Sequence, residues 1–143
     1  MREEELTAAF GGGRVSAQRR AIAECACGMS SAFTIDELAR AAARTRPGIG
    51  VATVYRAVAA LAATGFLEAV GSRAGSTLYI RCAYDSHHHH LVCTSCGAVA
   101  EAACPLAAGA LGGAEQAGYV VTSHEVTIYG LCPACAPRGS EVA

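Results

Sequence analysis

Two Cys-x-x-Cys pairs constrain this chain more than any other feature of its sequence. The first pair is Cys93 and Cys96, and 35 residues separate it from the second, Cys132 and Cys135. Four thiolates held by two tight knuckles form the closed tetrahedral site that is typical of structural Zn²⁺. We therefore predict that these cysteines bind one structural zinc ion. Redox dithiols are the alternative, and the absence of a surrounding thioredoxin-like strand–helix–strand pattern disfavours them.

Eight cysteines in 143 residues is a high count, and its meaning depends on the compartment. The chain starts MREEELTAAF, which lacks the apolar region of a signal peptide. No run approaches the roughly 18 apolar residues of a membrane span. We therefore expect a cytoplasmic protein without a membrane partner, in which paired cysteines bind metal rather than form disulfides.

The net charge of −1 conceals an uneven distribution along the chain. Residues 6–82 hold nine arginines against four acidic residues, a net of +5. Residues 83–143 hold one arginine against five acidic residues, a net of −4. A basic front half and an acidic rear half indicate that only the front half faces a polyanion such as DNA.

The front half carries the start and stop signals of four helices. Ser16 is placed to cap one helix, and Thr34 with Glu37 three residues later forms the capping box of the next. Gly28 and a Pro-Gly turn at Pro47 and Gly48 follow these two segments. We expect helices over about residues 2–10, 17–27, 35–44 and 51–64.

The helix over residues 51–64 has two different faces. Four apolar residues at helical spacing predict its buried stripe: Val54, Ala57, Val58 and Leu61. The opposite stripe combines alanines with Tyr55 and Arg56. Such a face suits the DNA major groove, because small residues permit close approach and arginine can bond a guanine edge or a phosphate. An ordinary solvent-exposed face is the alternative.

Two β-prone runs, 66–70 and 77–80, follow this helix and are joined by a predicted turn over 71–76 with an arginine at its tip. Helices followed by a hairpin are the pattern of a winged helix-turn-helix domain. We therefore expect double-stranded DNA as a partner. The predicted contact residues are Tyr55, Arg56, Thr53, Arg19, Arg20 and Arg73.

Four consecutive histidines run into the first cysteine pair. In an extended strand, alternate side chains point to opposite faces, so His88 and His90 share one face, and His87 and His89 share the other. The run therefore predicts ligands for two metal sites rather than one. A solvated polar loop is the alternative.

Each histidine face needs further ligands. Cys82 and Glu68 are the candidates for the face of His88 and His90, and this donor set favours Zn²⁺ over iron or manganese. A small buried hydrophobe is the alternative role for Cys82. His124 and Glu101 are the remaining candidates for the other face. The three remaining cysteines have no partner by spacing and are predicted to pack in the interior: Cys25, Cys27 and Cys104.

The segments RVSAQRRAI, GIGVATVYRAVAAL, HHHHLVCTSCG and CPAC resemble those of the ferric-uptake-regulator family, and within it are most similar to the zinc-uptake regulators. The resemblance extends from about Ala9 to Ala136. It implies an α+β fold, with a winged helix-turn-helix domain over residues 1–82 and a small α/β dimerisation domain over residues 83–143. It also implies a homodimeric repressor that binds palindromic operators of metal-uptake genes when it is loaded with metal.

The family's functional residues can be placed on matching positions of this chain. Tyr55 and Arg56 correspond to the recognition-helix pair, and the two knuckles correspond to the structural zinc site. The resemblance implies a regulatory zinc site and a third metal site, whose usual glutamate corresponds to Ala108 here. The regulatory ligands are Glu68, Cys82, His88 and His90, and the third-site ligands are His87, His89 and His124.

The choice of metal follows from what the front half lacks. Iron, nickel and peroxide sensors of the family take a histidine from the front domain, but this chain has Phe33 in that neighbourhood and no histidine before His87. The difference supports zinc as the regulatory metal. An iron, nickel, manganese or peroxide sensor of the same family remains the alternative.

Two functions of other classes explain the sequence less well. A zinc enzyme needs an open coordination position and a nearby general base, for which Glu101 is a weak candidate, so we predict no enzymatic activity. A zinc store would leave the winged-helix half unexplained. Three glycines in the segment 105–117 cost up to ~1 kcal/mol each relative to alanine, so we expect its helix to be short or frayed.

Overall fold

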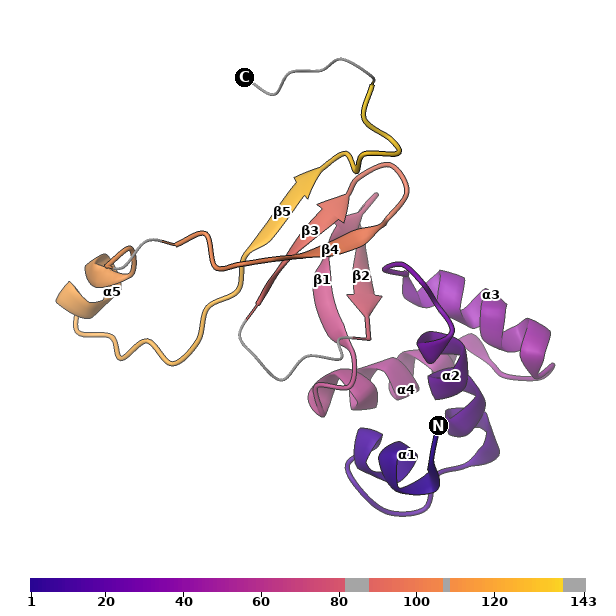
Figure 1. Cartoon of the computed structure of the whole chain (residues 1–143). Coiled ribbons are helices and arrows are strands. Elements are labelled where there is room, and N and C mark those ends of the chain that lie inside the picture. Colours follow the sequence, from indigo (N-terminus) through magenta and orange to yellow (C-terminus); the bar gives the residue numbers. More distant parts are fainter. Residues whose placement is uncertain (82–87, 107–108, 138–143) are drawn as a thin grey trace.

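A computed structural model describes residues 1–81, 88–106 and 109–137 of the chain. The front of the chain forms four helices that pack around one core (Figure 1). They are α1 (Glu3–Ala9), α2 (Ala17–Cys27), α3 (Ile35–Thr45) and α4 (Val51–Ala63). These bounds agree with the predicted helices to within one or two residues. Among the described residues, no helix is long and apolar enough to cross a membrane.

The predicted helix caps are confirmed. The Ser16 hydroxyl accepts a hydrogen bond from the backbone N–H of Arg19 at 3.3 Å, at the start of α2. At the start of α3, the Thr34 hydroxyl accepts from the backbone N–H of Glu37, and the Glu37 carboxylate accepts from the backbone N–H of Thr34 at 2.8 Å. These bonds satisfy N–H groups that the helix itself leaves unpaired.

The two faces of α4 are also confirmed. Its four predicted core residues are at most 1% exposed and pack with Leu6, Ile22 and Leu38 of the other helices. Tyr55 and Arg56 are exposed on the opposite side, together with the alanines of that stripe. Burial on one side therefore fixes which side of α4 is presented to the surroundings.

A hairpin follows α4, formed by β1 (Glu68–Arg73) and β2 (Ser76–Ile80). The predicted six-residue turn over 71–76 is wrong, because pairing continues to Arg73↔Ser76 and leaves only Ala74 and Gly75 in the turn. The register shifts between Ala69 and Gly71, and this bulge increases the local twist of β1.

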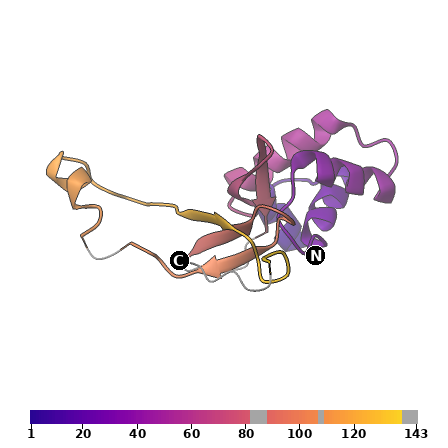
Figure 2. The ribbon, with the colours of Figure 1, turned by 90° about the horizontal axis from the view of Figure 1, so that it is seen from above.

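The rear half forms a three-stranded sheet in the order β4-β3-β5. Strand β3 (His89–Cys93) pairs antiparallel with β4 (Val99–Ala102) and parallel with β5 (Thr127–Gly130). Between β4 and β5 the chain travels away from the sheet and returns, carrying the short helix α5 (Gly112–Gln116) at its far end (Figures 1 and 2). The glycine-rich helix is short, as predicted.

The hairpin and the rear sheet share a second small core. Its buried residues come from the α2–α3 connection, both hairpin strands and β3: Ala32, Val70, Leu78 and Val92. Two hydrogen bonds reinforce the contact, from Ala32 N–H to the Gly97 carbonyl at 3.2 Å and from Ser72 N–H to the Tyr129 hydroxyl at 3.0 Å. Gly71 permits the approach of Tyr129, because a Cβ there would lie 2.3 Å from the Tyr129 oxygen. The predicted boundary at residue 82 lies outside the described residues and stays a prediction.

An ion pair ties the hairpin to α3. The Arg73 guanidinium lies 2.5 Å from the carboxylate of Glu37, which also closes the capping box of α3. The pKa of Glu37 is lowered, first by the hydrogen bond from the Thr34 backbone, against partial burial, and then by the positive charge of Arg73. One carboxylate thus serves both the helix cap and the hairpin.

We expect Glu37→Ala to destabilise the protein by about 1–2 kcal/mol, because it removes a cap and an ion pair. Glu37→Gln, which retains a capping amide, should cost less. Because folding lowers the pKa of Glu37, its contribution is full above the unfolded pKa and is lost as pH falls through the folded pKa. The difference between wild type and Glu37→Gln in urea unfolding should therefore shrink from pH 7 to pH 3. Asp36→Asn, a neighbouring first-turn carboxylate, is the control and should not reproduce the effect of Glu37→Ala.

Candidate metal centres and nucleic-acid interface

Three groups of possible metal ligands occur among the described residues, and within each group the ligand atoms lie within 4.8 Å of one another. We name them by position. The four-cysteine cluster contains Cys93, Cys96, Cys132 and Cys135. The hinge cluster contains Glu68, His88 and His90, and the neck cluster contains His89, Cys104 and His124.

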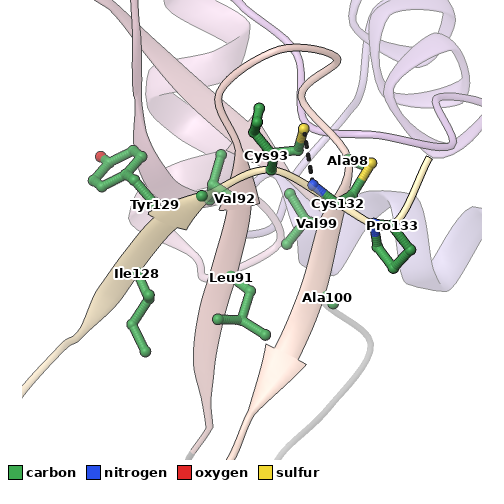
Figure 3. A pocket seen from close by; sticks show the side chains of 12 residues that line it. Leu91, Val92, Cys93, Ala98, Val99, Ala100, Ile128, Tyr129, Cys132 and Pro133 are labelled. Atoms are coloured by element: carbon green, nitrogen blue, oxygen red, sulfur yellow. Dashed lines mark hydrogen bonds between the residues drawn. The ribbon is translucent and has the colours of Figure 1, made fainter. Parts of the chain in front are cut away.

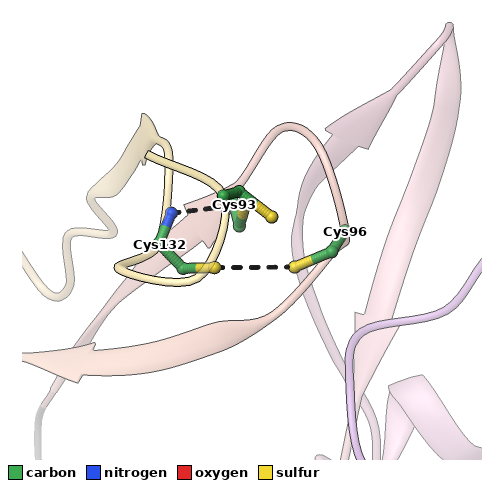
Figure 4. A group of neighbouring side chains, drawn as sticks. Cys93, Cys96 and Cys132 are labelled. Carbon is green, nitrogen blue, oxygen red and sulfur yellow. Dashed lines mark hydrogen bonds between the residues drawn. The ribbon is translucent and has the colours of Figure 1, made fainter. Parts of the chain in front are cut away.

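The four-cysteine cluster forms where β3 and β5 end side by side. Their parallel pairing places Cys93, the last residue of β3, opposite Gly130, the last residue of β5. The second knuckle begins two residues after Gly130, at Cys132, and therefore lies beside the first. The Cys96 and Cys132 sulfurs lie 3.7 Å apart, and the Cys132 backbone N–H donates to the Cys93 sulfur at 3.4 Å (Figure 4). Four sulfurs so placed match the donor set of a closed zinc site, as the sequence predicted.

The cysteines of this cluster differ in how readily they lose a proton. Backbone N–H groups of Cys132 and Cys96 stabilise the Cys93 thiolate and lower its pKa to about 6. At Cys135 the hydrogen bond with Ser95 lowers the pKa, but contacts with Cys132 and Cys96 outweigh it and raise the pKa to about 11. An ion that binds all four sulfurs must therefore displace a thiol proton.

The hinge cluster joins the hairpin to the rear half. Glu68 is the first residue of β1, and its carboxylate lies 4.0 Å from His90 Nε2. The rings of His88 and His90 are 4.8 Å apart and nearly perpendicular. The strand alternation that was predicted for these two histidines is confirmed. Cys82, the fourth predicted ligand, lies outside the described residues.

Burial disfavours the charged form of the His90 imidazole, and the neutral form is the one that binds metal. The ring is 8% exposed, and desolvation lowers its pKa, with a further lowering by His88 and an opposing effect of Glu68. Glu101 also raises the pKa of His90, because the two residues face each other across β3 and β4. Paired residues point to the same face, so the predicted grouping of Glu101 with His89 is wrong.

The neck cluster lies on the other face of β3. The Cys104 sulfur is 3.2 Å from His124 Nε2, and the rings of His89 and His124 are 5.1 Å apart. His89 and His124 lie together as predicted, but their role as metal ligands stays a prediction. His87 and Ala108 lie outside the described residues. The predicted packing role of Cys104 is wrong, since its side chain is exposed and contacts a histidine.

The strand pattern beyond β4 explains this error. Ala102 pairs with His89, and Cys104, two residues later, continues on the same side. The sequence contained the spacing of Ala102 and Cys104 but not the register that placed it against His89. Cys25 packs against the front core as predicted, and Cys25 and Cys27 belong to none of the clusters in the described part of the chain.

The outer face of α4 is the candidate nucleic-acid interface. Tyr55 is 50% exposed, and the Arg56 guanidinium donates to the Thr53 hydroxyl at 3.3 Å, which orients it along the helix. Arg19 lies over the Phe10 ring at 5.2 Å, and Arg20 forms an ion pair with Glu3. The roles of these residues in DNA contact stay predictions.

Arg73 does not lie as expected. It pairs with Ser76 at the last ladder position of the hairpin, so it flanks the tip instead of forming it. Its guanidinium turns back to Glu37, and it also lies against Gly97 of the first knuckle. This orientation favours a structural role over the predicted DNA contact.

A model of the ferric uptake regulator family matches residues 11–129. The chain belongs to the ferric uptake regulator family. Its relatives in this family include the zinc uptake regulation protein of Mycobacterium tuberculosis. That protein is 34% identical over 125 residues, which cover 87% of this chain and 95% of the relative.

Two solved structures share the fold of this family member. A zinc uptake regulator complexed with zinc and DNA is 25% identical, with a TM-score of 0.68 over 92% of this chain and 88% of that chain. A zinc-bound manganese uptake regulator is 28% identical, with a TM-score of 0.62 over 90% and 97% of the two chains. All three relatives are named as regulators, and the predicted family and α+β fold are confirmed.

We expect Cys96→Ser to lose one zinc ion per subunit and to unfold the rear sheet, because a structural zinc site contributes on the order of 10 kcal/mol. Zinc content after gel filtration and thermal melting followed by circular dichroism measure both effects. Cys27→Ser, outside the cluster, is the matched control and should keep the zinc and the melting curve. Unchanged zinc content in Cys96→Ser would contradict the assignment of Cys96 as a required ligand.

Proposed function

We propose that this protein is a zinc-responsive, DNA-binding transcriptional repressor of metal-uptake genes that acts as a homodimer in the cytoplasm. The observation that carries the proposal is the hinge cluster, whose ligands come from both sides of the joint between the hairpin and the rear sheet. An ion there would bond Glu68 on one side and His88 and His90 on the other. Metal would thus set how the DNA-reading helix is held relative to the rear half.

The DNA-reading part of the proposal rests on α4 and the hairpin. The exposed stripe of α4 is narrow, since alanines flank Tyr55 and Arg56, and this allows close approach to base edges. The front half carries the positive charge that phosphate contacts require, and the rear half is acidic. The solved relative complexed with zinc and DNA has the same fold.

Zinc is the proposed ion because of the donors. Two imidazoles and a carboxylate in the hinge cluster, with Cys82 as the proposed thiolate, form a mixed set that suits Zn²⁺ better than iron or manganese. The choice of zinc is also supported by the zinc uptake regulation protein of Mycobacterium tuberculosis, which aligns with this chain over 95% of its own length. A manganese, iron, nickel or peroxide sensor is the second candidate, since a zinc-bound manganese uptake regulator shares the fold. We propose no catalytic activity.

The apolar face of the rear sheet supports a homodimer. Leu91, Ala100 and Ile128 lie side by side in register across the three strands, and Leu91 and Ile128 are each 39% exposed (Figure 3). They line an apolar pocket that continues to Leu131 and Pro133. Apolar surface of this kind on a sheet is stabilised when another chain covers it, and a dimeric repressor needs a second copy for the two halves of a palindrome.

The mechanism that follows is a clamp. The small shared core and the hydrogen bond of Ser72 hold the hairpin against the sheet, and the hydrogen bond of Ala32 ties the α2–α3 connection to the first knuckle. Zinc held by Glu68, His88 and His90 would add bonds across the contact between the hairpin and the rear sheet, and would lower the cost of ordering the two copies of α4 on DNA. Such coupling is typically about 1–3 kcal/mol, which corresponds to a change in DNA affinity of about 5–150-fold.

The test uses double-stranded DNA selected from a random pool by the zinc-loaded protein. We expect fluorescence anisotropy to show binding that weakens about 5–150-fold after mild chelation. His88→Ala and Cys82→Ser should remain folded and lose this dependence on zinc. Glu115→Ala, an exposed change on α5, is the control. The repressor proposal fails if loaded and stripped wild type bind DNA equally, and the ligand assignment fails if His88→Ala retains the wild-type response.

A second measurement concerns α4, the proposed DNA-reading helix. We expect Arg56→Ala to weaken binding of the selected DNA by about 5–150-fold, because loss of a bidentate base contact costs about 1–3 kcal/mol. Arg44→Ala removes the same charge from the end of α3 and should have a smaller effect. Equal losses in the two variants would mean that Arg56 contributes charge alone and does not read sequence.

A further inference from the structure

The segment from Cys104 to His124, which we call the excursion, leaves the rear sheet and returns to it. Figures 1 and 2 show its described part reaching away from the sheet, with α5 at the far end. Several of its apolar side chains are exposed, including Tyr119 at 72% and Val120 at 88%. These side chains of the excursion therefore lie outside the core of the rear half.

The neck cluster lies where these two ends meet. Cys104 and His124 are the first and last residues of the excursion, and their ligand atoms are 3.2 Å apart. His89, on the central strand β3, lies beneath them and is 1% exposed. All three ligand atoms lie within 4.8 Å of one another.

The family resemblance already implies a third metal site at His89 and His124, in which Ala108 stands where a glutamate ligand is usual. We propose that Cys104 supplies the missing ligand of this site as a thiolate, and that the ion fastens the two ends of the excursion to the central strand. This goes beyond the proposed repressor function, which needs an ion only at the hinge cluster. One sulfur and two imidazoles are borderline-soft donors, which suit Zn²⁺ better than Mg²⁺ or Mn²⁺. Binding releases the Cys104 thiol proton to solvent and forms the metal–sulfur bond.

The alternative is a thiol–imidazole hydrogen bond without metal, and the position of His89 argues against it. A hydrogen bond between Cys104 and His124 needs no third group, yet a second imidazole is held in place beside them. The Val126 backbone N–H donates to His89 Nδ1 at 3.1 Å and fixes the plane of this ring. When an ion binds His89, the ring gives up either this bond or a ring proton, so the Val126 amide reports on occupancy.

The mechanical consequence concerns the chain between the two ends. An ion bonded to residues 104, 124 and 89 closes the excursion into a loop anchored on the middle of the sheet. Closure removes conformational freedom from the whole enclosed segment, including the exposed Tyr119 and Val120. The ion should therefore protect the excursion from amide exchange without altering the contact between the hairpin and the sheet.

The test is ¹¹³Cd NMR of the full-length protein after its zinc has been replaced by cadmium. We expect wild type to give one resonance more than Cys104→Ala, and the four-cysteine resonance to be unchanged between them. Cys104→Asp, which keeps an anionic ligand, should move the neck resonance rather than remove it. Cys27→Ser is the matched thiol control and should reproduce the wild-type spectrum. Identical spectra for wild type and Cys104→Ala overturn the proposal.

Amide exchange supplies the second readout. In wild type, zinc should slow amide exchange in the described part of the excursion and change the exchange rate of the Val126 amide, relative to the zinc-free protein. Cys104→Ala should lose both effects. Equal protection in the two proteins overturns the tethering role. Zinc-dependent DNA binding is expected to persist in Cys104→Ala, so failure of the neck site and failure of the repressor proposal give different results. Cys104 is exposed, and unchanged circular dichroism checks that its replacement leaves the fold intact.

Discussion

The pleat of strand β3 is the constraint on which the three clusters depend. His90 and Val92 point toward the hairpin, whereas His89 and Leu91 point to the opposite face. Cys93 ends the strand beside the second knuckle. Because side chains alternate strictly, a shift of one residue in the register would move the histidines of the hinge and neck clusters to each other's faces. Pairing with both β4 and β5 holds the register, so hydrogen bonds in the sheet determine which ligands meet.

The rear half has little else to hold it together. Besides the histidines, Val92 and Cys93 are the buried side chains in its described part, while the front half buries a core built from four helices. A small unit with so thin a core ordinarily needs metal or a partner subunit. The four-cysteine cluster joins the ends of β3 and β5, and the apolar row at Leu91 and Ile128 offers a surface for a second copy. Because the core is so thin, we expect metal and subunit pairing to influence the stability of this half strongly.

The sequence predicted local features better than it predicted pairing. Capping at Ser16 and Thr34, the faces of α4 and the alternation of the histidines depend on near neighbours along the chain, and all three are confirmed. Glu101 and Cys104 were assigned wrongly because their faces depend on the register between β3 and β4, which no local pattern fixes. Arg73 was misplaced because its partner, Glu37, lies 36 residues away and was already assigned to a helix cap.

The three clusters differ in the parts of the chain that they join, and this decides which ion can act as a signal. The four-cysteine and neck clusters connect segments within the rear half alone, from β3 onward. The hinge cluster includes Glu68, which begins the hairpin that follows α4, the proposed DNA-reading helix. A ligand shifts an equilibrium only through its different affinity for the two states. We expect loss of an ion whose ligands all move together to change stability alone, whereas loss of an ion at the hinge cluster would change how α4 is held relative to the rear sheet. We therefore propose that regulation by metal belongs at Glu68, His88 and His90.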